Sequence, residues 1–327
     1  MLIAIDHGNK QIKTARCPPF VSGLVESAQK PFGKDVLAYG NKFYTLSGQR
    51  IPYRRDKTED ERFFVLTLFA IAKELLTANT NADGLAAVKL AVGLPPAHYG
   101  AQNQVFTEYF SRRGVLRFGY HDRAFSVCIN DVRCYPQAYA AAATLLNDLM
   151  HCPKVLIVDI GGFTADYLMM RRGQADLSVC DSLENGVIVL YNRIRARAGA
   201  DFDLLLDEED IDAILKGQNA GFSPQVTAMV ETMAADFVND LFSSLRERML
   251  ELSSGVTVFV GGGAALLRRQ IEESGKVETA RFIEDVRANA KGYEFLYRME
   301  TAGRWQDEAE KRSREIYDQA ERKRPGA

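Results

Sequence analysis

Three short runs of apolar residues, far apart in the chain, have the pattern of buried strands. Residues 2–5, 155–158 and 257–260 are continuously apolar apart from Thr257, and a carboxylate or a run of glycines follows each of them. A continuous apolar run of this length is typical of a strand that is covered on both faces. The chain is therefore predicted to place polar or glycine-rich loops at the ends of three core strands.

Other segments have the periodicity of helices or of half-buried strands. Weak alternation broken by glycines over 20–55 predicts short antiparallel strands. Apolar residues at helical spacing predict helices at about 59–76, 99–112, 136–149, 186–198, 207–216 and 224–252. Further strands are predicted at about 11–17, 88–92, 165–170 and 175–180. This mixture of elements indicates an α/β protein.

One pattern occurs twice at half-chain distance. Residues 1–7 and 155–161 each give an apolar strand and an Asp, and each leads through an Asp-x-Gly sequence into a polar turn and a second strand. A repeat of this kind predicts two related α/β halves. Because ligands of open α/β sheets bind where strand ends converge, we expect a site between the halves.

Composition narrows the classes of function. The chain has 327 residues with 41 Lys and Arg against 43 Asp and Glu, a formal charge of −2, whereas proteins that grip nucleic acid carry a basic excess. Five cysteines without a C-x-x-C pattern and four scattered histidines argue against zinc and favour a reducing compartment. No apolar run reaches the roughly 18–20 residues of a membrane span. We therefore expect a cytoplasmic protein that contacts neither nucleic acid nor membrane directly.

The first candidate loop follows the first strand. Gly8 and Asn9 form a turn in which the backbone can approach a phosphate closely, and the Lys13 ammonium could reach the same anion. Asp6, at the strand end, could face a hydrated Mg²⁺ ion. An ordinary hairpin with an Asn-containing turn would have the same residues, so this loop alone leaves both interpretations open.

The second and third loops strengthen the phosphate interpretation. Gly161, Gly162 and Thr164 follow the second buried strand and can wrap phosphates, while Asp159 offers the metal a second carboxylate. Three glycines, 261–263, stand between a strand and a predicted helix and leave room for a flat ligand or a phosphate. Neither G-x-G-x-x-G nor a P-loop motif is present, so these two nucleotide-binding folds are not supported.

The order of these loops resembles the actin-like ATPase superfamily, and more narrowly the ParM-type plasmid-segregation actins. The segments that carry the resemblance are Asp6–Lys13, Pro136–Ala141, Asp159–Asp166, Gly261–Leu267 and Asn289–Tyr293. It implies an α/β fold of two actin-like (ribonuclease H-like) domains with a nucleotide cleft between them, each with a smaller subdomain. Domain I would span 1–150 with a small subdomain at about 20–95. Domain II would span 151–327, with final helices at about 288–300 packing back near domain I and a charged tail helix at about 303–324.

The resemblance also implies roles for the loop residues in binding ATP and Mg²⁺. Asp6 and Asp159 would hold the metal, mostly through waters, and Asp159 and Gln137 would be catalytic. Gln137 occupies the position where ParM-type proteins often have a carboxylate and actins have glutamine. It would therefore orient the attacking water rather than deprotonate it, unless it is only an early residue of a helix that begins at Pro136. The phosphates would be bound by Gly8, Asn9, Lys13, Gly161, Gly162 and Thr164, and the ribose and α-phosphate would be flanked by Gly261, Gly262 and Gly263.

The implied function is that of an ATP-dependent, filament-forming bacterial actin. Such a protein would polymerise with itself, segregate plasmid or similar DNA through an adaptor protein, and lose its filaments after ATP hydrolysis. A small-molecule kinase of the same superfamily is the alternative, although it needs a general base and Gln137 is not one. A chaperone-like ATPase is disfavoured because no peptide-binding β-domain follows residue 300. Trp305 could anchor the tail against the body or against a neighbouring subunit, and both possibilities stay open.

Overall fold

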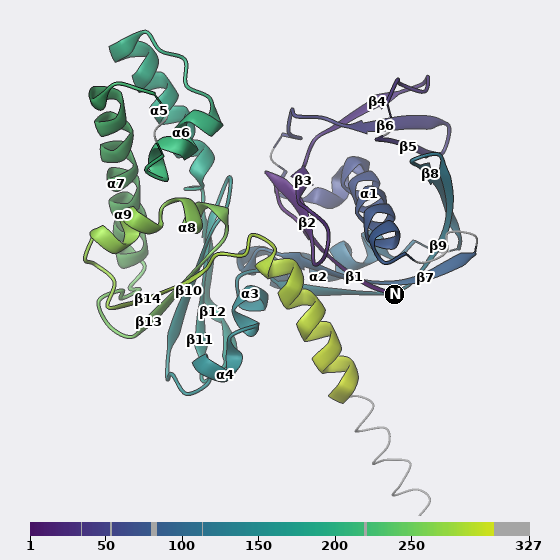
Figure 1. Ribbon diagram of the computed structural model, residues 1–327. Helices are drawn as coiled ribbons and strands as arrows, with labels where there is room; N and C mark the ends of the chain where they lie inside the picture. Colours follow the sequence, from purple (N-terminus) through teal and green to yellow (C-terminus); the bar gives the residue numbers. More distant parts are fainter. Residues whose placement is uncertain (34, 53, 80–83, 113, 219–220, 304–327) are drawn as a thin grey trace, which may run out of the picture.

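The computed structural model describes residues 1–33, 35–52, 54–79, 84–112, 114–218 and 221–303, so the predicted tail helix and Trp305 lie outside the described residues. Within the described part, the chain forms two halves that lie side by side, each built on one mixed sheet (Figure 1). The first half has nine strands in the order β3-β2-β1-β7-β9-β8-β5-β6-β4, and the second has five in the order β12-β11-β10-β13-β14. No described helix is long and apolar enough to cross a membrane.

The strands of the first sheet come from residues 2–136. Their bounds are β1 Leu2–His7, β2 Gln11–Thr14, β3 Phe20–Val21, β4 Leu24–Ser27, β5 Val36–Tyr39, β6 Lys42–Leu46, β7 Leu85–Leu94, β8 Leu116–Tyr120 and β9 Arg123–Pro136. The sheet curls around helix α1 (Glu61–Thr77), which is almost entirely buried, and helix α2 (Pro96–Phe110) follows β7 (Figure 1). A short helix η1 (Lys57–Glu59) precedes α1.

The second sheet is covered by helices that pack together. Its strands are β10 Val155–Ile160, β11 Ala165–Arg171, β12 Gln174–Leu183, β13 Val256–Val260 and β14 Thr279–Ile283. Its helices are α3 Tyr139–Ala143, α4 Leu146–Leu149, α5 Val187–Phe202, α6 Glu208–Leu215, α7 Pro224–Glu247, α8 Gly262–Leu266 and α9 Arg268–Glu273. The amphipathic helices α5, α6 and α7 bury their apolar faces in one core with β10 and β11.

The predicted half-chain repeat is present as a repeat of structure. In each half an antiparallel hairpin (β1–β2 or β10–β11) is extended by a parallel strand (β7 or β13) on the other side of its first strand. The registers also correspond, because Asp6 pairs with Lys13 in the first hairpin and Asp159 pairs with Asp166 in the second. The predicted α/β fold with two related halves is therefore confirmed.

The prediction of one helix over about 136–149 was wrong, and the two strands at 116–136 were not predicted. Strand β9 runs to Pro136, and the alanine-rich segment behind it forms only the short helices α3 and α4 rather than one helix over 136–149. Ala138, between β9 and α3, has a φ of 61° and a ψ of −59°, which lies outside the right-handed helical region, so no continuous helix runs from Pro136 into α3. The small subdomain expected at about 20–95 stays a prediction. Strands β4–β6 from this segment join the first sheet through the pairing of β5 with β8, and β7 lies beside β1.

The helix that begins at residue 288, described as far as 303, returns to the first half. Tyr293 and Tyr297 are buried with Ala4, Ala91, Tyr135 and Ala140. The approach to α3 is so close that a Cβ atom on Gly292 would lie 1.8 Å from the carbonyl oxygen of Ala140. Backbone contact of this kind requires glycine. This helix is therefore packed tightly against the segment that joins the two halves.

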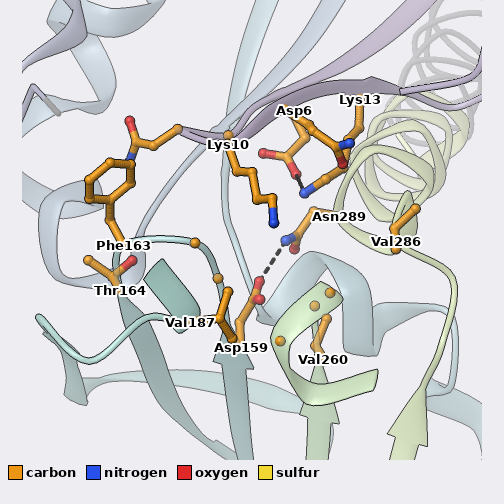
Figure 2. Close-up of a pocket in the computed structure, with 18 of the residues that line it drawn as sticks. Asp6, Lys10, Lys13, Asp159, Phe163, Thr164, Val187, Val260, Val286 and Asn289 are labelled. Carbon is orange, nitrogen blue, oxygen red and sulfur yellow. Dashed lines mark hydrogen bonds and ion pairs between the residues drawn. The ribbon is translucent and has the colours of Figure 1, made fainter. Parts of the chain in front are cut away.

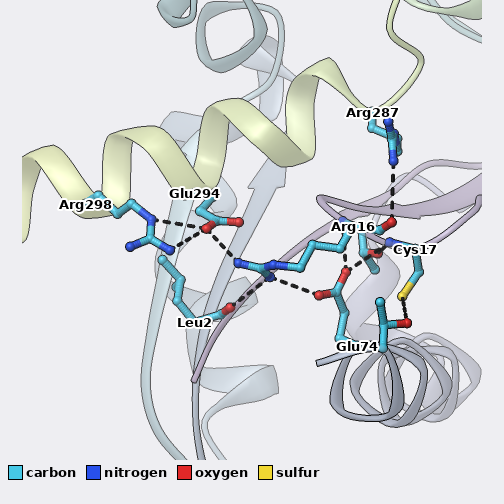
Figure 3. A network of polar contacts seen from close by, with 9 residues as sticks. Leu2, Arg16, Cys17, Glu74, Arg287, Glu294 and Arg298 are labelled. Atoms are coloured by element: carbon cyan, nitrogen blue, oxygen red, sulfur yellow. Dashed lines mark hydrogen bonds and ion pairs between the residues drawn. The ribbon is translucent and has the colours of Figure 1, made fainter. Parts of the chain in front are cut away.

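An ion-pair network ties the same helix to the first sheet and to α1 (Figure 3). Arg16, just after β2, forms ion pairs with Glu74 of α1 at 2.9 Å and with Glu294 of the returning helix at 2.8 Å. Glu74 is completely buried and also accepts hydrogen bonds from the backbone N–H groups of Arg16 and Cys17. Arg16 therefore joins three elements that are far apart in the sequence.

Candidate functional site

A cavity of about 370 Å³ lies between the two halves, where the ends of β1, β10 and β13 meet (Figure 2). Loops from both halves line it. The structure brings together all the residues that the sequence predicted for the site: Asp6, Gly8, Asn9, Lys13, Gln137, Asp159, Gly161, Gly162, Thr164, Gly261, Gly262 and Gly263. The repeated Asp-x-Gly loops thus face one shared space.

Two buried carboxylates, Asp6 and Asp159, line this cavity. Asp6 is 2% exposed and forms an ion pair with Lys13 at 3.3 Å. Asp159 is 7% exposed, and its burial raises the pKa of its carboxyl group, although hydrogen bonding to Asn289 and the charge of Lys13 oppose that shift. The pKa of Lys13 is raised, because Asp6 and Asp159 outweigh the opposing effect of its burial. Two carboxylates and one ammonium group therefore lie close together in a part of the cavity that is largely shielded from solvent.

Each carboxylate is held by an amide side chain from a segment that joins the halves. The Gln137 Nε2 donates to Asp6 Oδ1 at 3.0 Å, and the Asn289 Nδ2 donates to Asp159 Oδ2 at 2.7 Å. The Asn289 Oδ1 also accepts a hydrogen bond from the Ala138 N–H at 2.9 Å. Gln137 precedes α3, so the alternative of Gln137 as a helical residue is not supported. The two connections between the halves thus meet at the carboxylates.

The glycine positions leave room that side chains would fill. A Cβ atom on Gly261, which has a φ of 93°, would lie 2.3 Å from the Asp159 Oδ1, and one on Gly8 would lie 2.6 Å from the Gln11 carbonyl oxygen. At Gly262, by contrast, nothing lies within 4 Å, so its backbone is open to the cavity. The glycines therefore allow the tight loop conformations and keep backbone accessible, as a phosphate-binding cradle requires.

Three residues with buried polar groups at the cavity were not assigned roles from the sequence: Lys57, Asp166 and Asn289. Burial raises the pKa of Asp166 to about 7, while the hydroxyl groups of Ser182 and Thr164 donate hydrogen bonds to its carboxylate. Asp166 follows Asp159 by the same seven residues that separate Lys13 from Asp6, and this spacing could have identified it. No local pattern marks Lys57, which the fold brings in from the segment before α1.

Ion pairs also bridge the two halves across the cleft. Glu208, the first residue of α6 in the second half, forms ion pairs with two cations of the first half, Lys10 at 2.8 Å and Arg50 at 2.7 Å. The Lys10 ammonium also lies 4.8 Å from the centre of the Tyr191 ring. The halves are thus joined by two covalent connections and by these ion pairs.

The donor set of the cavity suits a phosphate ligand with a hydrated divalent cation. Within the described residues, no cluster of three or more His, Cys, Asp or Glu side chains forms a metal site. Two carboxylates with several water positions are, however, what Mg²⁺ commonly uses when phosphate oxygens complete its coordination. The Lys13 ammonium and the accessible backbone N–H groups of the glycines are suited to donate hydrogen bonds to the phosphate oxygens.

Comparisons with known proteins agree in both halves of the chain. The N-terminal domain model of actin-like proteins matches residues 4–139, and the C-terminal domain model of the archaeal MreB-like actin homologue matches residues 157–273. No curated protein sequence matches the chain.

Solved structures with similar folds cover almost the whole chain. The archaeal actin homologue Ta0583 in complex with ADP is 17% identical with a TM-score of 0.72, covering 91% of this chain and 99% of that one. The apo psk41 ParM protein is 14% identical with a TM-score of 0.70 (92% and 98% covered). Bacillus thuringiensis ParM with ATP is 13% identical with a TM-score of 0.65 (92% and 99% covered). At such low sequence identities, these comparisons show that the chain shares the fold of those structures.

Proposed function

We propose that this chain, which belongs to the actin-like superfamily, binds and hydrolyses ATP and assembles into filaments. The predicted actin-like fold is confirmed by the two domain models and by the similar solved structures. The observation that carries the proposal is the meeting of both Asp-x-Gly loops and the glycine triplet in one cavity. Structures of similar fold are described with ADP and with ATP, which supports a nucleotide as the ligand.

In the proposed complex, each part of the cavity has a role that follows from its chemistry. The phosphates are held by the Lys13 ammonium and by the loops at Gly8–Asn9 and Gly161–Thr164, while the glycines 261–263 lie along the ribose and α-phosphate. Asp6 and Asp159 hold Mg²⁺, mostly through waters. When bound, Mg²⁺ neutralises charge that develops on the phosphate oxygens.

Gln137 is proposed to orient the attacking water. Its Nε2 donates to Asp6, so the orientation of the side chain is fixed before nucleotide arrives. The amide oxygen then remains available to accept a hydrogen bond from water, and an amide cannot remove the proton fully. Positioning of this kind accelerates hydrolysis without a strong base.

Filament formation would follow from closure of the cleft. A triphosphate that contacts loops of both halves favours their closed arrangement, and loss of the terminal phosphate removes some of those contacts. A filament structure of Alp12 has a similar fold, with 14% identity, a TM-score of 0.62 and coverage of 90% of this chain and 97% of that one, which supports self-assembly as the outcome. Because the net charge is only −2, we propose that any plasmid or similar DNA is bound through an adaptor protein.

Electron microscopy and light scattering with purified protein test this proposal. Mg-ATP and a non-hydrolysable analogue should both produce filaments, whereas ADP should not. Filaments formed with ATP should disappear after hydrolysis, and those formed with the analogue should persist. Dispersed protein under all these conditions, together with ATP turnover that a sugar or organic acid stimulates, would instead support the small-molecule kinase.

Replacing Gln137 by alanine should slow phosphate release by about tenfold to a thousandfold while filaments still form and last longer. The change removes the group that orients water but leaves the phosphate loops intact. Phosphate release and filament lifetime should be measured on the same preparation, with nucleotide affinity as the control. An unchanged rate of phosphate release would remove Gln137 from the mechanism.

A further inference from the structure

Lys57 is a buried lysine of the cleft cavity that has no carboxylate partner in the described part of the chain. It is the first residue of η1 and is 7% exposed. The other lysines that line the cavity each form an ion pair: Lys10 with Glu208, Lys13 with Asp6 and Lys216 with Asp212. Lysine is almost never buried unless it is paired. The exception at Lys57 therefore calls for a ligand.

The contacts of the Lys57 ammonium are neutral. It donates a hydrogen bond to the carbonyl oxygen of His7 at 2.5 Å, and it lies 5.7 Å from the centre of the Phe63 ring. An ammonium has three N–H donors, so the carbonyl uses only one of them. Burial lowers the pKa of Lys57 to about 8, since the longer-range attraction of Asp6 and Asp166 offsets only part of the effect. Among the described residues, no acceptor other than this carbonyl lies within hydrogen-bond distance of the ammonium, so its remaining donors can be used by an anion in the cavity.

The backbone around Lys57 is fixed by its neighbours. The Asp56 carboxylate accepts hydrogen bonds from the N–H and the hydroxyl group of Thr58 at 2.9 and 2.7 Å. Asp60 then caps α1 by accepting from the Arg62 N–H at 3.0 Å. Lys57 is therefore held in a rigid turn that continues directly into α1, the central helix of the first half.

We propose that Lys57 binds the terminal phosphate of a nucleoside triphosphate and so connects that phosphate to the first half of the molecule. The Gly161–Thr164 loop of the second half lines the same cavity, so an anion between them contacts both halves. This inference rests on the proposed function and adds to it a residue that distinguishes ATP from ADP. Inorganic phosphate left after hydrolysis has the same chemistry, and the experiment must separate the two.

Replacing Lys57 by methionine keeps an unbranched apolar side chain of similar length near Phe63 and removes the charge. Binding of fluorescent derivatives of a non-hydrolysable ATP analogue and of ADP should be measured by titration with the full chain. The dissociation constant for the analogue should rise about ten- to a hundredfold, and that for ADP should change by less than about threefold. Lys57→Arg should retain most of the preference for the analogue. Lys89→Met, an exposed change on β7 outside the cavity, serves as the matched control for fold and charge.

Several results would overturn the inference. Equal weakening of ADP and analogue binding would mean that Lys57 only shapes the cavity, and unchanged analogue binding would remove it from the site. Titration of inorganic phosphate onto the ADP complex separates the two anions. If Lys57→Met abolishes only that response, free phosphate is the ligand and the terminal-phosphate assignment is wrong.

The proposed function is tested separately by the wild-type protein. If the wild type binds neither nucleotide, the function and the inference fail together. If the wild type polymerises with ATP and the Lys57→Met variant keeps the full preference for the analogue over ADP, only the inference fails.

Discussion

Replacing Asp159 by asparagine should lower the rate of ATP hydrolysis by about a hundred- to a thousandfold, with a much smaller loss of nucleotide affinity. Asparagine keeps a side-chain oxygen that can accept the hydrogen bond from Asn289, so the local structure should survive. What it removes is a buried negative charge beside the phosphate loop, where the charge of the proposed metal must be balanced. Phosphate release at saturating Mg-ATP measures the effect.

The Asp159 prediction has a matched control on the same half of the protein. Asp236 is an exposed carboxylate on α7, and Asp236→Asn makes the same chemical change far from the cavity lining. This control should hydrolyse ATP at the wild-type rate. Turnover by Asp159→Asn that equals that of the control would contradict the catalytic assignment.

Replacing Arg16 by alanine should lower the free energy of unfolding by about 3 kcal/mol. The change leaves the completely buried carboxylate of Glu74 without its cation, although two backbone N–H groups still donate to it. We expect the lower end of the range for a broken buried pair, because Arg16 itself is about one-third exposed and partly screened by solvent. Urea-induced unfolding followed by circular dichroism measures the loss.

Two further variants identify the cause of that loss. Arg298→Ala removes another arginine bound to Glu294, but on the exposed surface of the returning helix, and it should cost well under 1 kcal/mol. Adding Glu74→Gln to Arg16→Ala should recover part of the stability, because the buried charge is then gone. If Arg16→Ala and Arg298→Ala have the same effect, the buried pair contributes nothing of its own.

The loops of the site were predictable because their signal is local. An apolar run, a carboxylate and glycines at fixed spacing specify a strand end and a turn within about ten residues, and this occurs at Asp6, at Asp159 and before the glycine triplet. The half-chain repeat and the family resemblance together predicted that these loops meet at one cavity. The sequence of the segments between the loops does not predict this by itself.

What was missed depends on contacts between distant segments. Strand β9 carries charged residues such as Asp131 and Arg133, which interrupt its apolar alternation. Those side chains are used by the returning helix, where Tyr297 donates to Asp131 and Arg133 forms an ion pair with Glu300. Lys57 is similar, since only the packing of η1 under β1 makes it a cavity residue. Such positions look like solvated surface until the partner segment is known.

The two connections between the halves have a consequence for how the protein is made. The chain leaves the first half after residue 136 and returns to it at residue 288, so the second half is a continuous insertion within the first. A ribosome builds the chain from its N-terminus, and domains tend to fold as they emerge. All strands of the inserted half are therefore synthesised before Tyr293 and Tyr297. These two tyrosines complete a cluster of buried alanine and tyrosine side chains in the nine-stranded half. Asn289, which holds Asp159, arrives with the same helix, so newly made protein gains its finished cavity only after this helix has been synthesised.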